Sequence, residues 1–178
     1  SLMGLRSYGY ESISPVLWTG GRTAKCIDDA AAGDLMAGRE AFLDRIRESY
    51  QQVCVGKRIV IVEGTGQPGV GSVAGVSNAD VINALRDMGV PVFVIMVAPG
   101  GIGSTIDEVF PYLMAMDHLG TKVDGIIVNG VYENKIDKIR HYLDTYYDGV
   151  FDVLYGRELL KYSHPTILGY IPAIPQLR

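Results

Sequence analysis

The residues with the clearest chemical potential lie in one short stretch, residues 59–72, which reads IVIVEGTGQPGVGS. Glu63 follows four apolar residues directly and precedes Gly64, Thr65 and Gly66. A carboxylate at the end of a buried strand can bind Mg²⁺ beside a nucleotide or orient a substrate, and glycines let the backbone approach an anion. Glu63 could equally accept hydrogen bonds from nearby backbone N–H groups, and the spacing favours neither role.

The same glycine-rich stretch has part of the pattern of a phosphate-binding loop, GxxxxGK[ST]. Gly64 and Gly69 have the required spacing, but Val70 occupies the lysine position and Gly71 separates it from Ser72. The lysine charge that meets the outer phosphates is therefore missing, and only the weaker backbone contribution remains. We expect a flexible turn with positive-φ glycines here, and not a phosphate loop in its own right.

A second group of candidates follows a later apolar run, in the loop that contains Pro99, Gly100, Gly101, Gly103 and Ser104. Its GxG pattern lacks the third glycine of a dinucleotide-binding turn. The next strand expected ends in Asn129, where that motif would have a ribose-binding acid. Dinucleotide binding is thus a weak alternative. The Asn129 amide could pair with the edge of a base, but it could also cap the turn at Gly130, which we favour from the residue alone.

Other reactive side chains form no pattern that indicates chemistry. His118, His141 and His164 are far apart, and Cys26 and Cys54 have no metal-ligand spacing, which favours reduced thiols in a cytosolic protein. The tyrosines of residues 142–162 could form a stacking surface, although such clusters more often pack a helix against its neighbours or a partner subunit.

The elements that must position these residues alternate along the chain. Runs that are apolar at every position predict strands covered on both faces, and apolar residues at spacings of three and four predict helices. Ser77 or Asn78 should cap one helix, and Ser104 with Asp107 should form a capping box for the next, which Pro111 should kink. The expected strands are 59–62, 92–97, 123–129 and 166–171, and the expected helices are 35–53, 78–88, 104–119, 135–146 and 150–161.

This order predicts an α/β fold of three layers: a mainly parallel sheet of at least four strands, with helices on both faces. We expect one domain over residues 1–178, with residues 3–34 as an irregular N-terminal segment and Ser1 and Leu2 as a tag remnant before Met3. The net charge of −4 and scattered basic residues argue against nucleic-acid binding. No apolar run could span a membrane, so a cytoplasmic protein is expected.

Several motifs, taken in order, resemble the later part of the dethiobiotin synthetase-like and cobyrinic acid a,c-diamide synthase-like branch of P-loop ATPases. They are VEGTGQPGVGS, SNADVINAL, VFVIMVAPGGIGSTIDE, VDGIIVN and ILGYIP, and they cover roughly residues 57–175. The resemblance implies an enzyme that binds ATP and Mg²⁺ and activates a substrate carboxylate by phosphorylation.

The resemblance also implies roles for individual residues. Glu63 would lie at the metal and the substrate, with Gly64, Thr65 and Gly66 beside the cofactor. Asn129 would read adenine, and Ile171 and Pro172 would line the base. The loop from Pro99 to Ser104 would lie near the substrate and a dimer interface.

This sequence departs from the family pattern before Glu63, because the initial strand, the GxxxxGK[ST] loop and its helix are missing. We therefore expect part of an ATP- and Mg²⁺-dependent enzyme, completed by upstream sequence or by another polypeptide and with little phosphoryl transfer alone. A homodimer or a partner chain that supplies the phosphate loop is expected. The alternative is a non-catalytic module that uses the same sheet to bind a small ligand or a protein.

Overall fold

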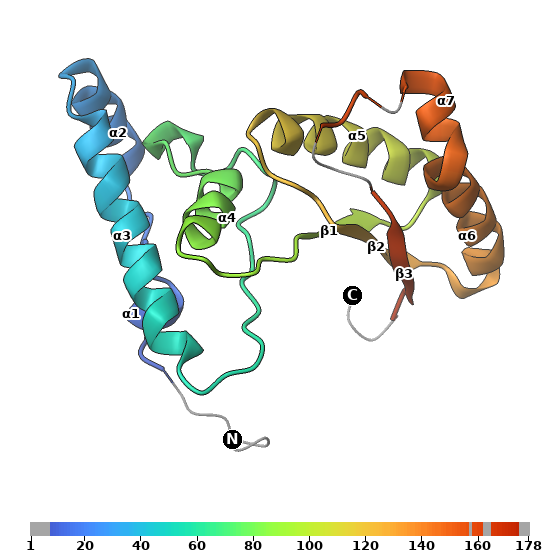
Figure 1. The fold of residues 1–178 in the computed structure, drawn as a ribbon, viewed down its shortest axis with the longest axis horizontal. Coiled ribbons are helices and arrows are strands. Elements are labelled where there is room, and N and C mark those ends of the chain that lie inside the picture. The colour runs from blue at the N-terminus through green and yellow to red at the C-terminus, as the bar shows by residue number, and fades with distance from the viewer. Residues whose placement is uncertain (1–7, 157, 162–164, 175–178) are drawn as a thin grey trace. The chain divides into compact units, whose positions relative to one another are not determined.

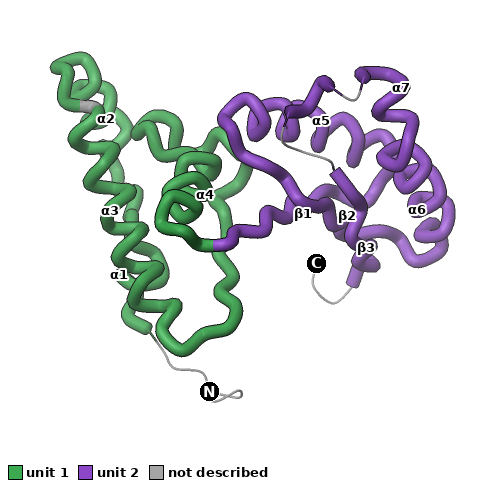
Figure 2. Tube along the Cα trace, in the orientation of Figure 1, with its two compact units in different colours: residues 1–90 green, residues 91–178 purple. Residues whose placement is uncertain are grey.

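The computed structural model describes residues 8–156, 158–161 and 165–174. The chain divides into two compact units, residues 1–90 and residues 91–178 (Figure 2). The expectation of a single domain stays a prediction.

The described part of the first unit consists of helices and connecting segments (Figure 1). Residues 3–34 were expected to be irregular, but they contain α1 and α2. The signal for α2 is RTAKCIDDAA, a run without glycine or proline in which Lys25 and Asp29 form an i,i+4 ion pair. The elements are α1 (Tyr10–Ile13), α2 (Arg22–Ala31), α3 (Leu35–Cys54), the 3₁₀ turn η1 (Ser72–Ala74) and α4 (Asn78–Asp87).

The predictions for α3 and α4 are confirmed. Helix α3 buries Phe42 and Leu43. Its charged residues Glu40, Asp44, Arg45 and Glu48 are exposed, whereas Arg39 is half-buried and pairs with Asp80 of α4. Helix α4 begins with a capping box, in which the Ser77 hydroxyl accepts from the Asp80 N–H and the Asp80 carboxylate accepts from the Ser77 N–H. This reciprocal pair satisfies two N–H groups that a helix start leaves without partners.

The strand predicted at residues 59–62 is absent from the described structure, and this prediction is wrong. The segment pairs with no other strand, and Ile59 and Ile61 are 82% and 91% exposed. A strand needs a neighbour for its N–H and C=O groups, and the described residues of the first unit form no strand at all. An apolar run therefore does not by itself make a strand.

The second unit is built on a parallel sheet of three strands in the order β1-β2-β3. Backbone pairing places Ile95 opposite Gly125 and Ile126 opposite Ile167. The central strand is buried, with Ile126 and Val128 fully inaccessible. The strands are β1 (Ile95–Pro99), β2 (Gly125–Val131) and β3 (Ile167–Pro172), which confirms the last two predicted strands.

Helix α5 connects β1 to β2, and α6 lies between β2 and β3 (Figure 1). Both connections advance across the sheet in the same direction, so right-handed crossovers place both helices on the same face. This arrangement agrees with the observed contacts: α5 contacts α6 and β1, and α6 contacts β3. The helical elements are α5 (Ile102–His118), the 3₁₀ turn η2 (Glu133–Lys135), α6 (Ile136–Thr145), the π-helical turn η3 (Tyr146–Val150) and α7 (Phe151–Tyr155).

The core of this unit lies between the sheet and these helices. Leu113 of α5 and Leu143 of α6 are fully buried, as are Ile126 and Val128 of β2. The predicted parallel α/β fold class is confirmed. The second unit contains one helical layer, and a further layer on the other face stays a prediction.

Three details differ from the expectations for this unit. Strand β1 begins at Ile95 and not at residue 92, because Val94 hydrogen-bonds to the backbone and the carboxylate of Asp124 before the ladder begins. It lies at the edge of the sheet, with Val97 62% exposed, and not in its interior. Helix α5 begins at Ile102 with Gly101 as N-cap, so the predicted capping box of Ser104 and Asp107 is wrong.

The helix expected over residues 150–161 ends at Tyr155, where Gly156 adopts a positive φ of 81°. Pro111 lies inside α5, as the sequence predicts. Among the described residues, no helix is long and apolar enough to cross a membrane.

Candidate functional site

Three residues predicted separately lie in one row at the carboxyl edge of the sheet. Pro99 of β1 pairs with Asn129 of β2, and Asn129 pairs with Ile171 of β3. The next pair across the sheet joins Val131 to Pro172. In open parallel sheets, ligands bind outside the carboxyl ends of the strands. The structure therefore brings the predicted base-reading residue, the base-lining residues and the substrate loop to one edge.

The side chains of this row remain available to a ligand. Asn129 is exposed, and its amide forms no hydrogen bond with the described residues. The alternative that Asn129 caps the turn at Gly130 thus has no side-chain hydrogen bond to support it. Ile171 is 42% exposed and Pro172 is also exposed, so an apolar surface lies next to a free amide donor and acceptor.

Backbone contacts hold the first two strand ends together. A Cβ atom on Gly100 would lie 2.7 Å from the carbonyl carbon and oxygen of Gly130 and from the Val131 nitrogen. Only glycine allows this approach without a shift of the backbone. Gly130 itself has a positive φ of 76° and lies at the irregularity in register between Asn129 and Val131.

Thr105 fixes the loop that follows β1. It is fully buried, and its hydroxyl contacts the carbonyl oxygens of Pro99, at 2.6 Å, and Gly101. The Gly101 N–H donates to the Pro99 carbonyl at 3.1 Å. Gly103 and Ser104 lie exposed on the first turn of α5. Sequence reasoning missed Thr105; the spacing of a small hydroxyl residue after the Gly-rich turn is the signal that could have found it.

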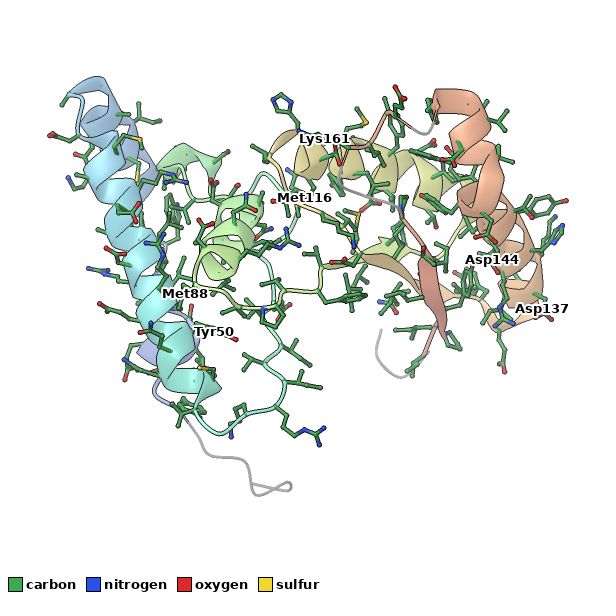
Figure 3. All side chains as sticks on the ribbon, in the orientation of Figure 1. Tyr50, Met88, Met116, Asp137, Asp144 and Lys161 are labelled. Atoms are coloured by element: carbon green, nitrogen blue, oxygen red, sulfur yellow. The ribbon has the colours of Figure 1, made fainter. Side chains whose placement is uncertain are left out.

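Strand β3 is tied to α6 by a second contact that sequence reasoning missed. The Tyr170 hydroxyl donates to Asp144 Oδ1 at 2.7 Å, and Asp144 lies on α6 (Figure 3). Burial and this hydrogen bond to the Asp144 carboxylate raise the pKa of Tyr170 well above its ordinary value. The contact fixes the strand that carries Ile171 and Pro172.

Glu63 and the glycine-rich stretch belong to the first unit. Glu63, Gly64, Thr65 and Gly66 are all exposed. Their loop is fastened to the start of α4 by Asn78, whose amide accepts from the Thr65 N–H at 3.2 Å and donates to the carbonyls of Thr65 and Gln67 at 3.3 and 3.0 Å. Gly66 has a positive φ of 59°, as expected of a turn.

Three N–H groups of this loop are unavailable to the phosphates of a nucleotide. The N–H groups of Val70, Ser72 and Ala74 donate to carbonyls within the same loop, at Gln67, Gly69 and Gly71 respectively. A phosphate cradle needs such N–H groups to be free and to converge on the anion. The turn predicted from the missing lysine is thus what the structure contains.

The described residues contain no group of three or more His, Cys, Asp or Glu side chains that could hold a metal ion. Mg²⁺ commonly uses only one or two carboxylates together with phosphate oxygens and water. The metal role expected of Glu63 therefore requires a bound nucleotide and stays a prediction.

With this geometry in hand, comparison with protein families gives one match. A family model described as the AAA domain matches residues 25–178, which is most of the chain. Comparison with curated proteins and with solved structures gives no match.

Proposed function

The chain belongs to the AAA domain family, a P-loop NTPase-type family, and from this premise we propose that the carboxyl edge of its sheet binds the base of a nucleotide. We further propose that the chain is part of an ATP- and Mg²⁺-dependent enzyme that activates a carboxylate, similar to dethiobiotin synthetase. The observation that carries the proposal is the row formed by Pro99, Asn129 and Ile171.

The chemistry of this row suits adenine. The Asn129 amide offers one acceptor and two donors, and an adenine edge presents an amino donor beside a ring-nitrogen acceptor. Ile171 and Pro172 would contact the face of the base, where burial of apolar surface adds affinity. The exposed position of all three side chains supports access for a ligand of this size.

The described residues offer hydrogen-bonding and apolar groups for a base, but no phosphate loop for the triphosphate. The 178 residues contain no GxxxxGK[ST] sequence, and the N–H groups of Val70, Ser72 and Ala74 in the glycine-rich loop are used internally. ATP, when bound with Mg²⁺, would supply the phosphoryl group for carboxylate activation. We assign no phosphoryl step to this chain's residues, and propose that upstream sequence or another polypeptide provides the phosphate loop.

Base recognition without phosphate contacts predicts weak binding. We expect ADP and adenosine to bind with dissociation constants of about 1 mM, equivalent to roughly −4 kcal/mol, and Mg²⁺ to leave both values unchanged. Calorimetric titration of the full chain measures this directly. Asn129→Ala should weaken binding about tenfold or more, because a paired amide contributes on the order of 1–3 kcal/mol to base recognition.

Asn134→Ala is the matched control, since Asn134 is an exposed asparagine in the adjoining turn η2. Equal binding by the two variants would contradict the role of Asn129. Micromolar, Mg²⁺-dependent binding of ATP by this chain alone would contradict the proposal that the phosphate loop comes from elsewhere.

A second candidate function is a non-catalytic module that binds a small ligand or a protein through the same sheet. The glycine-rich loop favours the non-catalytic module, because hydrogen bonds within the loop already use its Val70, Ser72 and Ala74 N–H groups. One experiment distinguishes the two proposals: a polypeptide that carries the missing phosphate loop is added to the chain, and ATP binding is measured. If the chain is part of the enzyme, ATP binding should strengthen. If it is a non-catalytic module, ATP binding should not change.

A further inference from the structure

A groove of about 500 Å³ lies within the first unit, between α2, α3 and η1. These three elements contact one another directly. The volume falls in the range of small-molecule sites, roughly 300–1,000 Å³. Neither Glu63 nor any residue of the second unit lines it, so the site is separate from the one proposed above.

The wall of the groove carries an excess of positive charge. Its basic residues are Arg22, Lys25, Arg39 and Arg45, and its acidic residues are Asp29 and Asp34. Lys25 pairs with Asp29 at 2.9 Å, and Arg39 pairs with Asp80 of α4 at 2.9 Å.

Two arginines are left for a ligand. Arg22 and Arg45 form no ion pair with the described residues. Asp34 is the remaining acid of the wall, so the uncommitted charge is positive. The Arg22 guanidinium lies over the Phe42 ring, 5.0 Å from its centroid, which holds this cation at the groove by a cation–π contact.

The floor of the groove is apolar. Cys26, Phe42 and Ala74 form a buried cluster and are 7%, 9% and 2% exposed. A ligand that fills such a groove must present an apolar group to the floor and a negative charge to the arginines, since guanidinium groups pair in a fork geometry with carboxylate or phosphate.

We propose that this groove binds a small organic anion, with a phosphate or carboxylate between Arg22 and Arg45 and an apolar group against Phe42 and Ala74. The proposal does not depend on nucleotide binding in the second unit. Phosphate esters and carboxylates share the required chemistry, and the test separates them by using one probe of each kind.

The chain contains a natural reporter for this groove. Trp18 is its one tryptophan, and it precedes Thr19, which lines the groove. The Trp18 indole N–H donates to the Thr23 hydroxyl of α2 at 3.1 Å. Its fluorescence should therefore respond when a ligand enters, independently of events at Asn129.

The test is a fluorescence titration of the full chain with phenyl phosphate, benzoate, inorganic phosphate and benzyl alcohol. Phenyl phosphate or benzoate should give a saturable change in Trp18 emission, and the tighter of the two identifies the preferred anion. Inorganic phosphate and benzyl alcohol should bind at least about tenfold more weakly, because each lacks one half of the required chemistry. No saturable change with either organic anion would overturn the proposal, as would equal binding of inorganic phosphate.

Arg45→Gln should weaken the preferred anion about tenfold or more, since a charge-assisted hydrogen bond is lost. Arg47→Gln makes the same charge change two residues away on α3, where Arg47 pairs with Glu40 and Asp44 and does not line the groove. Arg45→Lys should retain part of the affinity, and circular dichroism of the variants should match that of the wild-type chain. Equal weakening by Arg45→Gln and Arg47→Gln would overturn the proposal, because only general electrostatics would then be at work.

Discussion

The role of Asn129 could be predicted only in part from its residue type and its position in the sequence. Its type and its place after an apolar run suggest a polar group at the end of a strand. Only the strand register places it between Pro99 and Ile171, and that register depends on pairing between distant segments. The structure also leaves its amide free of the described residues, which the sequence could not indicate.

The hydrogen bond from Tyr170 to Asp144 should stabilise the strand that carries Ile171. Tyr170→Phe removes the 2.7 Å contact and leaves the ring in place, so we expect the free energy of unfolding to fall by about 1 kcal/mol. Urea denaturation measures this change. Tyr142→Phe is the control, because Tyr142 is 50% exposed on α6 and should change stability little. Equal effects of the two substitutions would contradict the structural role of the Tyr170 hydroxyl.

At the scale of elements, the loop between β1 and α5 depends on the fit of one glycine. Gly100→Ala would place a Cβ atom 2.7 Å from the backbone of Gly130 and Val131, so we expect a loss of about 1–3 kcal/mol and weaker ligand binding at the strand ends. Gly103→Ala is the matched substitution four residues from Pro99, with nothing within 4 Å of the new atom and a helical backbone. It should stabilise by up to about 1 kcal/mol. Thermal unfolding of both variants compares them, and a neutral Gly100→Ala would contradict the close approach.

Helix α4 depends on its capping box, which also connects it to α3. Ser77→Ala should cost about 1 kcal/mol of unfolding free energy, since an N-cap acceptor is lost. Ser72→Ala is the control, because Ser72 is exposed and forms no side-chain cap hydrogen bond. Chemical denaturation at neutral pH measures both, and indistinguishable values would contradict the importance of the cap.

Asp80 makes the same cap dependent on pH. Burial raises its pKa, but hydrogen bonds from Ser77 and the charge of Arg39 outweigh burial and hold the pKa below its ordinary value near 3.8. A lowered pKa in the folded state means that this stabilisation is complete above about pH 4 and disappears as the pH falls through the folded-state pKa. Asp80→Asn should therefore reduce the loss of stability between pH 5 and pH 2. An unchanged acid profile would show that Asp80 does not contribute to it.

Across the whole molecule, sequence patterns predicted those helices and strands whose formation depends mainly on nearby residues. Helices α3 and α4 followed from apolar spacing and a capping residue, and β2 and β3 from runs of apolar residues. The run at residues 59–62 looked the same, yet it forms no strand because strand formation needs a partner at long range. Helix α2 was missed because Gly20 and Gly21 directly precede it, and paired glycines are typical of a turn or loop.

The difference between the exposed residues 59–62 and the buried strand β2 can be tested directly. Ile61 is 91% exposed, so Ile61→Asp should change the free energy of unfolding by no more than about 0.5 kcal/mol. Ile126 is fully buried in β2, and Ile126→Asp should destabilise by several kcal/mol because it buries an unpaired carboxylate. Denaturation curves give both values. A large loss in Ile61→Asp would show that residues 59–62 are a buried strand after all.

We propose that the carboxyl edge of the sheet holds a nucleotide base, and an NMR titration of the full chain with adenosine is the most direct test. Adenosine lacks phosphates, so any specific effect must come from the base or the ribose. We predict saturable shifts of the amide signals of residues 129–131, 171, 173 and 174, which are lost in Asn129→Ala and kept in Asn134→Ala. Shifts confined to other residues, or shifts that Asn129→Ala does not alter, would contradict it.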